Sequence, residues 1–154
     1  MTNFSLSSPD FNQKDLIPKE YTCVGKNISP KLLWENPPKN TKSFALAIVD
    51  PDAPSGDFIH WVIYNIPASA NSLVQGVPTE SSLENKAMQG LNDFGRIGYG
   101  GPCPPKSEKH SYVFTLYALD TMLSLKPKAA YDDLQKAMEG HILGESELIG
   151  YFAK

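Results

Sequence analysis

Several signals that would place the chain in a membrane or an export pathway are missing from the sequence. Residues 1–20 contain no basic stretch followed by an apolar run, which a secretory signal would have. No apolar run approaches the ~18 residues of a membrane-spanning helix. The two cysteines, Cys23 and Cys103, are too few and too far apart for a disulfide framework or a CxxC motif, and allow at most one bridge. These absences predict a reduced, cytoplasmic protein without a membrane span, or a periplasmic one if Met1 replaces a removed signal.

An excess of basic residues is also absent. The 154 residues include 14 Lys or Arg and 17 Asp or Glu, which gives a formal charge of −3. Proteins that bind the phosphate backbone of nucleic acids usually carry a basic excess, so nucleic acid is not expected as the main partner. The sequence contains no internal repeat and no low-complexity segment, and its length suits one domain over residues 1–154.

Turn-forming residues, by contrast, are frequent. The chain has 13 Pro and 11 Gly, which break long helices and favour short strands joined by turns. Three runs rich in β-branched and aromatic residues predict the central strands of one sheet, at residues 44–49, 58–66 and 112–119. Shorter candidate strands cover residues 4–6, 32–34 and 148–152, and one helix is predicted over residues 129–141. The pattern predicts a mainly β protein, an antiparallel β-sandwich with Greek-key connections and one or two short peripheral helices.

A stiff acidic loop follows the first central strand. In Asp50-Pro51-Asp52-Ala53-Pro54, each proline fixes its own φ and keeps the preceding residue extended. The loop can therefore present the carboxylates of Asp50 and Asp52 on one side of the sheet edge. The alternative is that both are turn carboxylates that accept hydrogen bonds from nearby amides.

Two histidines accompany this loop. Strand alternation places His60 on the same face as Val62 and Tyr64, where a histidine is more often a satisfied core residue than a ligand. His110 and Tyr112 share a strand face about 7 Å apart. Two imidazoles and a phenol are suitable donors for an anion, and nearby carboxylates would orient the imidazoles and favour their protonated form.

A segment rich in glycine and proline precedes His110. Residues 98–105 read Gly-Tyr-Gly-Gly-Pro-Cys-Pro-Pro. Glycines leave backbone N–H groups approachable, and consecutive N–H groups in a turn form an anion-binding nest. The segment therefore predicts an anion cradle that its prolines stiffen.

Taken together and in this order, these motifs resemble the phosphatidylethanolamine-binding protein family, and more closely its bacterial and archaeal Raf-kinase-inhibitor-like branch. The resemblance rests on six segments spread over the chain, residues 27–34, 50–54, 60–61, 98–105, 110–114 and 140–151. It implies a β-sandwich with a shallow pocket at one edge. Such a pocket binds small anions, among them phosphate, carboxylates and the phosphorylated ethanolamine head group.

The resemblance also implies which residues bind the ligand. Asp50 lines the pocket and pairs with a histidine, and no metal or other cofactor is implied. A free Cys103 thiol is expected near the pocket mouth, and Cys23 is interpreted as a small buried thiol. The resemblance further implies a homodimer. The implied ligand-binding set is Asp50, Asp52, His60, Gly101, Pro105, His110 and Tyr112.

Three alternatives stay open at this point. Asp50, Asp52, His60 and His110 are also a donor set suited to Zn²⁺ or Mn²⁺. The same residues suit an enzyme that performs acid–base chemistry on a small phosphorylated or carboxylated substrate, for which Cys103 is the one candidate nucleophile. The pocket of a third kind of protein, an inhibitor of a kinase or protease, would bind an acidic segment of that partner.

Overall fold

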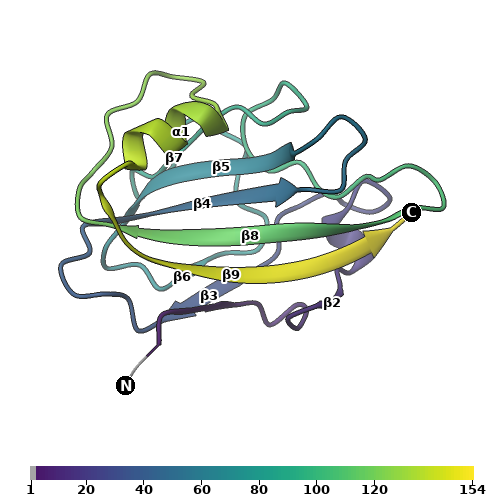
Figure 1. Ribbon diagram of the computed structural model, residues 1–154, viewed down its shortest axis with the longest axis horizontal. Helices are drawn as coiled ribbons and strands as arrows, with labels where there is room; N and C mark the ends of the chain where they lie inside the picture. The colour runs from purple at the N-terminus through teal and green to yellow at the C-terminus, as the bar shows by residue number, and fades with distance from the viewer. Residues whose placement is uncertain (1–2) are drawn as a thin grey trace.

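The long apolar runs of the sequence form the centre of the larger of two β-sheets (Figure 1). The computed structural model describes residues 3–154. In the larger sheet β4 (Ser43–Asp50) lies between β5 (Phe58–Pro67) and β8 (Lys109–Leu119). The long strand β9 (Ile142–Ala153) pairs with β8, and two short strands, β2 (Asp15–Leu16) and β7 (Met88–Gln89), complete the order β2-β9-β8-β4-β5-β7.

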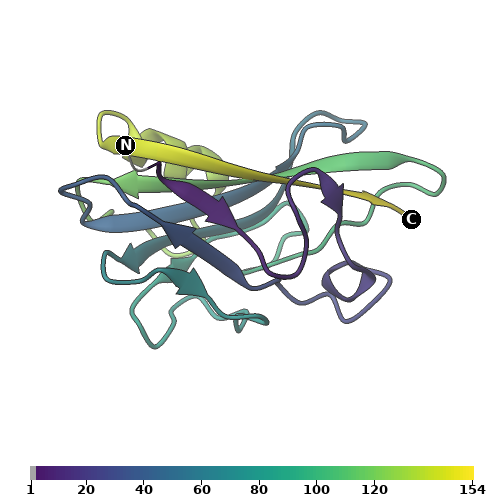
Figure 2. The same cartoon turned by 90° about the horizontal axis from the view of Figure 1, so that it is seen from below.

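The smaller sheet packs against one face of the larger one (Figure 2). It has the order β1-β3-β6, with β1 (Ser5–Ser7), β3 (Leu32–Glu35) and β6 (Ser72–Leu73). Aromatic side chains fill the space between the sheets, and the rings of Trp34 and Phe44 are 5.4 Å apart. A short 3-10 helix, η1 (Lys19–Tyr21), lies in the connection between β2 and β3.

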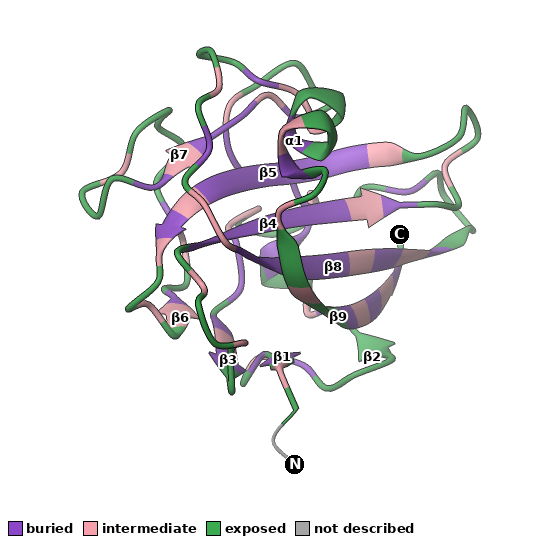
Figure 3. Ribbon diagram, turned by 60° about the vertical axis from the view of Figure 1, so that its left-hand side comes forward, coloured by how far each residue is buried: buried purple, intermediate pink, exposed green. Residues whose placement is uncertain are grey.

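A second apolar cluster lies on the opposite face of the larger sheet, beneath α1 (Tyr131–Met138). Leu134 and Met138 of this helix are buried with Val62 and Tyr64 of β5. The central strands are therefore covered on both faces, and Figure 3 shows β4 and β5 buried along most of their length. This arrangement explains why residues 44–49 are apolar at every position.

The predicted mainly β fold with two sheets and a short helix is confirmed. The three central strands are found where the sequence predicts them, whereas the helix covers eight of the thirteen predicted residues. The strand pairs are antiparallel except that β2 pairs with β9 in parallel. The sequence predicts none of the three two-residue strands, β2, β6 and β7, because two residues are too few to show alternation.

A β-bulge in β5 changes the face of the sheet on which the His60 side chain lies. The pairing with β4 passes from Ile48–Trp61 directly to Val49–Ile59, which leaves His60 as an extra residue on β5. Alternation is broken there, and the ring of His60 packs at 5.2 Å from Tyr112, on the side of the core between the sheets. The prediction that His60 shares a face with Val62 and Tyr64 is therefore wrong. One inserted residue reverses the faces of all residues before it.

Candidate functional site

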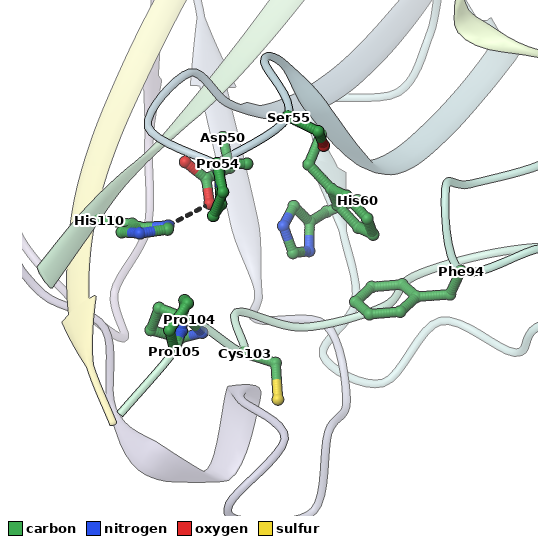
Figure 4. A pocket seen from close by; sticks show the side chains of 11 residues that line it. Asp50, Pro54, Ser55, His60, Phe94, Cys103, Pro104, Pro105 and His110 are labelled. Atoms are coloured by element: carbon green, nitrogen blue, oxygen red, sulfur yellow. Dashed lines mark hydrogen bonds and ion pairs between the residues drawn. The ribbon is translucent and has the colours of Figure 1, made fainter. Parts of the chain in front are cut away.

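The ends of three neighbouring strands surround a cavity of about 320 Å³. Asp50 ends β4, His60 lies near the start of β5, and His110 lies near the start of β8. Because β4 is antiparallel to both neighbours, its end and their beginnings meet at one edge of the sheet. Figure 4 shows Asp50 and His110 on one side of His60 and Phe94 on the other. The cavity is lined by Asp50, Ala53, Pro54, Ser55, Phe58, His60, Phe94, Cys103, Pro104, Pro105 and His110.

The strongest polar contact of the cavity joins His110 and Asp50. His110 Nδ1 donates to Asp50 Oδ2 over 2.6 Å, and both side chains are buried. The second oxygen of Asp50 accepts from the backbone N–H of Asp52 over 2.8 Å. The carboxylate is therefore fixed from two sides, and it holds the imidazole in one orientation.

The contacts of His110 favour its charged form. Its second nitrogen, Nε2, donates to Glu108 Oε1 over 2.9 Å, so carboxylates accept from both ring nitrogens. Burial alone would lower the pKa of His110, but the hydrogen bonds and negative charges of Glu108 and Asp50 outweigh it, and the pKa is raised above its usual value. His110 is thus an imidazolium whose two N–H donors are both in use.

His60 has the opposite character. Its Nδ1 donates to the carbonyl oxygen of Gly100 over 2.7 Å, and the Gly100 N–H in turn donates to the His60 carbonyl oxygen over 2.9 Å. Burial lowers the pKa of His60, and the Gly100 hydrogen bond and the Asp50 charge only partly oppose this. At pH 7 the ring is neutral and its Nε2 is an acceptor, which differs from the expected pair of protonated imidazoles.

Tyr112 lies behind the two histidines. Its ring centroid is 5.2 Å from that of His60 and 6.5 Å from that of His110. The hydroxyl is buried without a hydrogen-bond partner in the part of the chain that the structure describes. Burial and the charges of Asp50 and Asp52 raise the pKa of Tyr112, so the hydroxyl keeps its proton and is a free donor.

The side chain of Asp52 bonds to β8 and not to the histidines. Its Oδ2 accepts from the backbone N–H of Ser111 over 2.8 Å and from the Ser111 hydroxyl over 2.7 Å. These hydrogen bonds lower the pKa of Asp52. The residue does not line the cavity but fastens the acidic loop to β8, as the turn-carboxylate alternative describes.

The glycine-rich segment does not offer the expected free amides. The N–H groups of Gly98, Gly100 and Gly101 donate to the Gly90 carbonyl, the His60 carbonyl and Asn27 Oδ1. The predicted nest is therefore wrong for these three amides. A side chain at Gly101 would overlap the Tyr21 carbonyl and the Asn27 side chain, so this glycine permits close packing. Gly101 lies outside the cavity lining, whereas Pro105 is part of it.

A disulfide joins Cys23 and Cys103, 80 residues apart in sequence. The interpretation of two free thiols is therefore wrong. The pairing arises because η1 and the glycine-rich segment pack together, with the Cys23 N–H donating to the Pro102 carbonyl and the Tyr99 hydroxyl to the Tyr21 carbonyl. Distance along the sequence gives no sign of this contact. Cys103 lines the cavity as half of a cystine, so it is not a nucleophile there.

The side chains that could bind a metal are engaged in other contacts. Residues 3–154 contain no group of three His, Cys, Asp or Glu side chains arranged to hold a metal ion. Asp52 is occupied by Ser111, and both nitrogens of His110 are occupied by carboxylates. No helix in the described range is long and apolar enough to span a membrane.

Sequence reasoning missed several residues around the cavity. Glu108 and Phe58 each lie two positions before a predicted histidine, so strand alternation would have placed them next to it. Phe94 packs at 5.4 Å from the ring of His60 but comes from a separate loop, and no local signal identifies it.

Comparisons with known proteins agree with this architecture. The profile of the phosphatidylethanolamine-binding protein family matches residues 7–153. A UPF0098 protein of Methanothermobacter thermautotrophicus is 50% identical over 97% of this chain and 99% of its own length. The crystal structure of Escherichia coli YbcL, described as a new member of the mammalian PEBP family, has a TM-score of 0.92 at 30% identity and covers 99% of both chains. A homolog of the same family from Chlamydia trachomatis has a TM-score of 0.91 at 39% identity, covering 100% of this chain and 99% of its own.

Proposed function

Because the chain belongs to the phosphatidylethanolamine-binding protein family, we propose that its cavity binds a small anion, a phosphomonoester or a carboxylate. The observation that carries the proposal is the buried His110–Asp50 pair, 2.6 Å long, at a cavity that also contains the acceptor His60. A titratable group whose pKa is perturbed at a cavity is a candidate ligand-binding residue, and a protonated imidazole is a donor suited to an anion.

Each polar residue has a distinct part in this proposal. His110 supplies positive charge, and its Nε2–H becomes available to the ligand when the contact with Glu108 opens. Tyr112 lies behind the residues that line the cavity, and its unpartnered hydroxyl is a second donor for a ligand oxygen that reaches this depth. The free Nε2 of neutral His60 accepts from the ligand, for example from the P–OH of a phosphate monoanion. Pro105 and the aromatic ring of Phe58 contribute apolar contacts for the rest of the ligand. We assign Asp50 to orienting His110, and Asp52 and Gly101 to positioning the loops around the ligand.

Isothermal titration calorimetry with phosphate, O-phosphoethanolamine and acetate tests this function. We expect saturable binding to the unchanged protein and loss of binding in His110→Ala and His60→Ala. His141→Ala is the matched control, because His141 also bonds an aspartate but is half-exposed and does not line the cavity. Binding that survives both cavity substitutions would place the anion site elsewhere.

The other expectations from the resemblance stay predictions. A homodimer and a kinase or protease partner are tested by sedimentation and by inhibition assays with the purified chain. The formed disulfide bears on the predicted cytoplasmic location. Disulfides are typical of secreted and periplasmic proteins, but intracellular proteins of hyperthermophiles also contain them, so a cytoplasmic location fits a hyperthermophilic source. Fractionation of cells into cytoplasm and envelope would separate the two cases.

A further inference from the structure

Glu108 already occupies the donor that an anion would use. The Nε2 of His110 donates to Glu108 Oε1 over 2.9 Å, and Nδ1 donates to Asp50. An imidazolium has two N–H groups, so His110 has none left for a ligand. Asp50 is buried and fixed by the Asp52 N–H, which leaves the Glu108 contact as the one that can open.

The position of Glu108 allows it to leave. Its side chain is 50% exposed, and the His110 side chain beneath it is 4% exposed. Glu108 ends a tight turn in which its N–H donates to the Pro105 carbonyl over 3.1 Å, and residues 105–109 are all exposed. Rotation of the side chain into water therefore needs no movement of the core or of β8.

We propose that Glu108 is a built-in competitor for the anion site, a carboxylate that the ligand must displace from His110 Nε2 before it binds. This inference rests on the proposed function of the cavity. It adds a residue that lowers the affinity of the cavity for every anion that must displace it. An anion with several acceptor oxygens, such as phosphate, gains His110 and the other donors together when it displaces Glu108. Acetate gains fewer donors for the same displacement, so Glu108 makes acetate bind more weakly than phosphate.

Phosphate titrations of Glu108→Ala and Glu108→Gln test the competition, with the exposed Glu139→Gln as the matched carboxylate control. Release of a half-exposed ion pair predicts about twofold to fivefold tighter phosphate binding in Glu108→Ala. The gain in Glu108→Gln is smaller, since an amide oxygen still accepts from His110. Glu139→Gln binds phosphate like the unchanged protein. The titrations are repeated at about 0.5 M NaCl, where long-range charge effects are screened and a contact competition persists.

The outcomes separate the two proposals. Unchanged or weaker phosphate binding in Glu108→Ala, with normal binding by the unchanged protein, would overturn the competitor role and leave the anion site intact. A gain that disappears at high salt would also overturn it, because the effect would then come from net charge. Absence of phosphate, phosphoethanolamine and acetate binding in every variant would overturn both proposals.

Discussion

Two histidine–aspartate pairs of nearly equal length occur in this molecule. His110 Nδ1 lies 2.6 Å from Asp50 Oδ2, and His141 Nδ1 lies 2.8 Å from Asp120 Oδ1. The side chains of the first pair are 4% and 5% exposed, and those of the second are 45% and 42% exposed. The bond is the same in kind, but water reaches only the second pair freely.

The difference shows that burial gives the first pair its significance. Exposed ion pairs stabilise a protein by about 0–1 kcal/mol, since water already solvates both partners. Buried charges that lose their partner destabilise it by about 3–5 kcal/mol. The His110–Asp50 pair also borders a cavity and lies near an unpartnered tyrosine hydroxyl, whereas His141 closes the turn after α1. A short His–Asp distance alone would not distinguish the two.

The largest effect is expected from Asp50→Asn. At pH 5.5 this substitution leaves a buried imidazolium without its buried carboxylate partner and with only the half-exposed Glu108 in contact. The free energy of unfolding should fall by about 3–5 kcal/mol. Urea denaturation measures the loss. Asp120→Asn is the matched control and should cost less than about 1 kcal/mol. Equal losses in the two variants would contradict the distinction between the pairs.

Removal of the disulfide tests whether the bridge holds the glycine-rich segment in place beside the buried pair. Cys23→Ser combined with Cys103→Ser should lower the free energy of unfolding by about 2–4 kcal/mol, because the bridge closes a long loop. The substitution also loosens residues 98–105, so the amide hydrogens of Gly100 and Gly101 should exchange faster with solvent. The NMR signals of His141, which lies outside the cavity, should not move. Unchanged exchange at Gly100 would show that hydrogen bonds alone hold this segment.

The sequence was informative about the fold because the central strands are long and buried on both faces. Residues 44–49 and 58–66 are apolar or aromatic over enough positions to predict strands, and the helix shows its apolar side at Leu134 and Met138. Alternation failed at His60, because a bulge depends on the pairing of two strands and leaves no local pattern.

The sequence predicted part of the candidate site and missed the rest. Asp50, His60 and His110 line the cavity because they occur near strand ends that an antiparallel sheet brings together, and Pro105 lies in the loop that leads into β8. Phe94 and the Cys23–Cys103 bridge depend on loops that meet only in the folded chain. The sequence also could not predict the opposite pKa shifts of the two histidines, because these depend on the burial and the hydrogen bonds of each ring in the folded chain.

The smallest expected effect is the pH dependence of stability that comes from the two buried histidines. It distinguishes the two rings of the cavity from each other. The pKa of His110 is raised above 6.5, so its stabilising effect is complete below pH 6.5 and is lost as the pH rises through the folded-state pKa. The pKa of His60 is lowered, so its contribution is present above pH 6.5 and is lost as the pH falls through its folded-state pKa. A tenfold difference in proton affinity between the folded and unfolded chain corresponds to about 1.4 kcal/mol of stability.

NMR titration of the imidazole carbons should therefore give two curves displaced in opposite directions, with His60→Gln and His110→Gln assigning the signals. Urea denaturation of His60→Gln should show a smaller loss of stability between pH 6.5 and pH 4.5 than the unchanged protein, because the variant lacks the ring that must be charged in a buried site. His110→Gln should remove the loss of stability above pH 6.5 instead. Two buried histidines that titrate together would mean that the cavity treats both rings alike, and the separate roles of donor and acceptor would then be wrong.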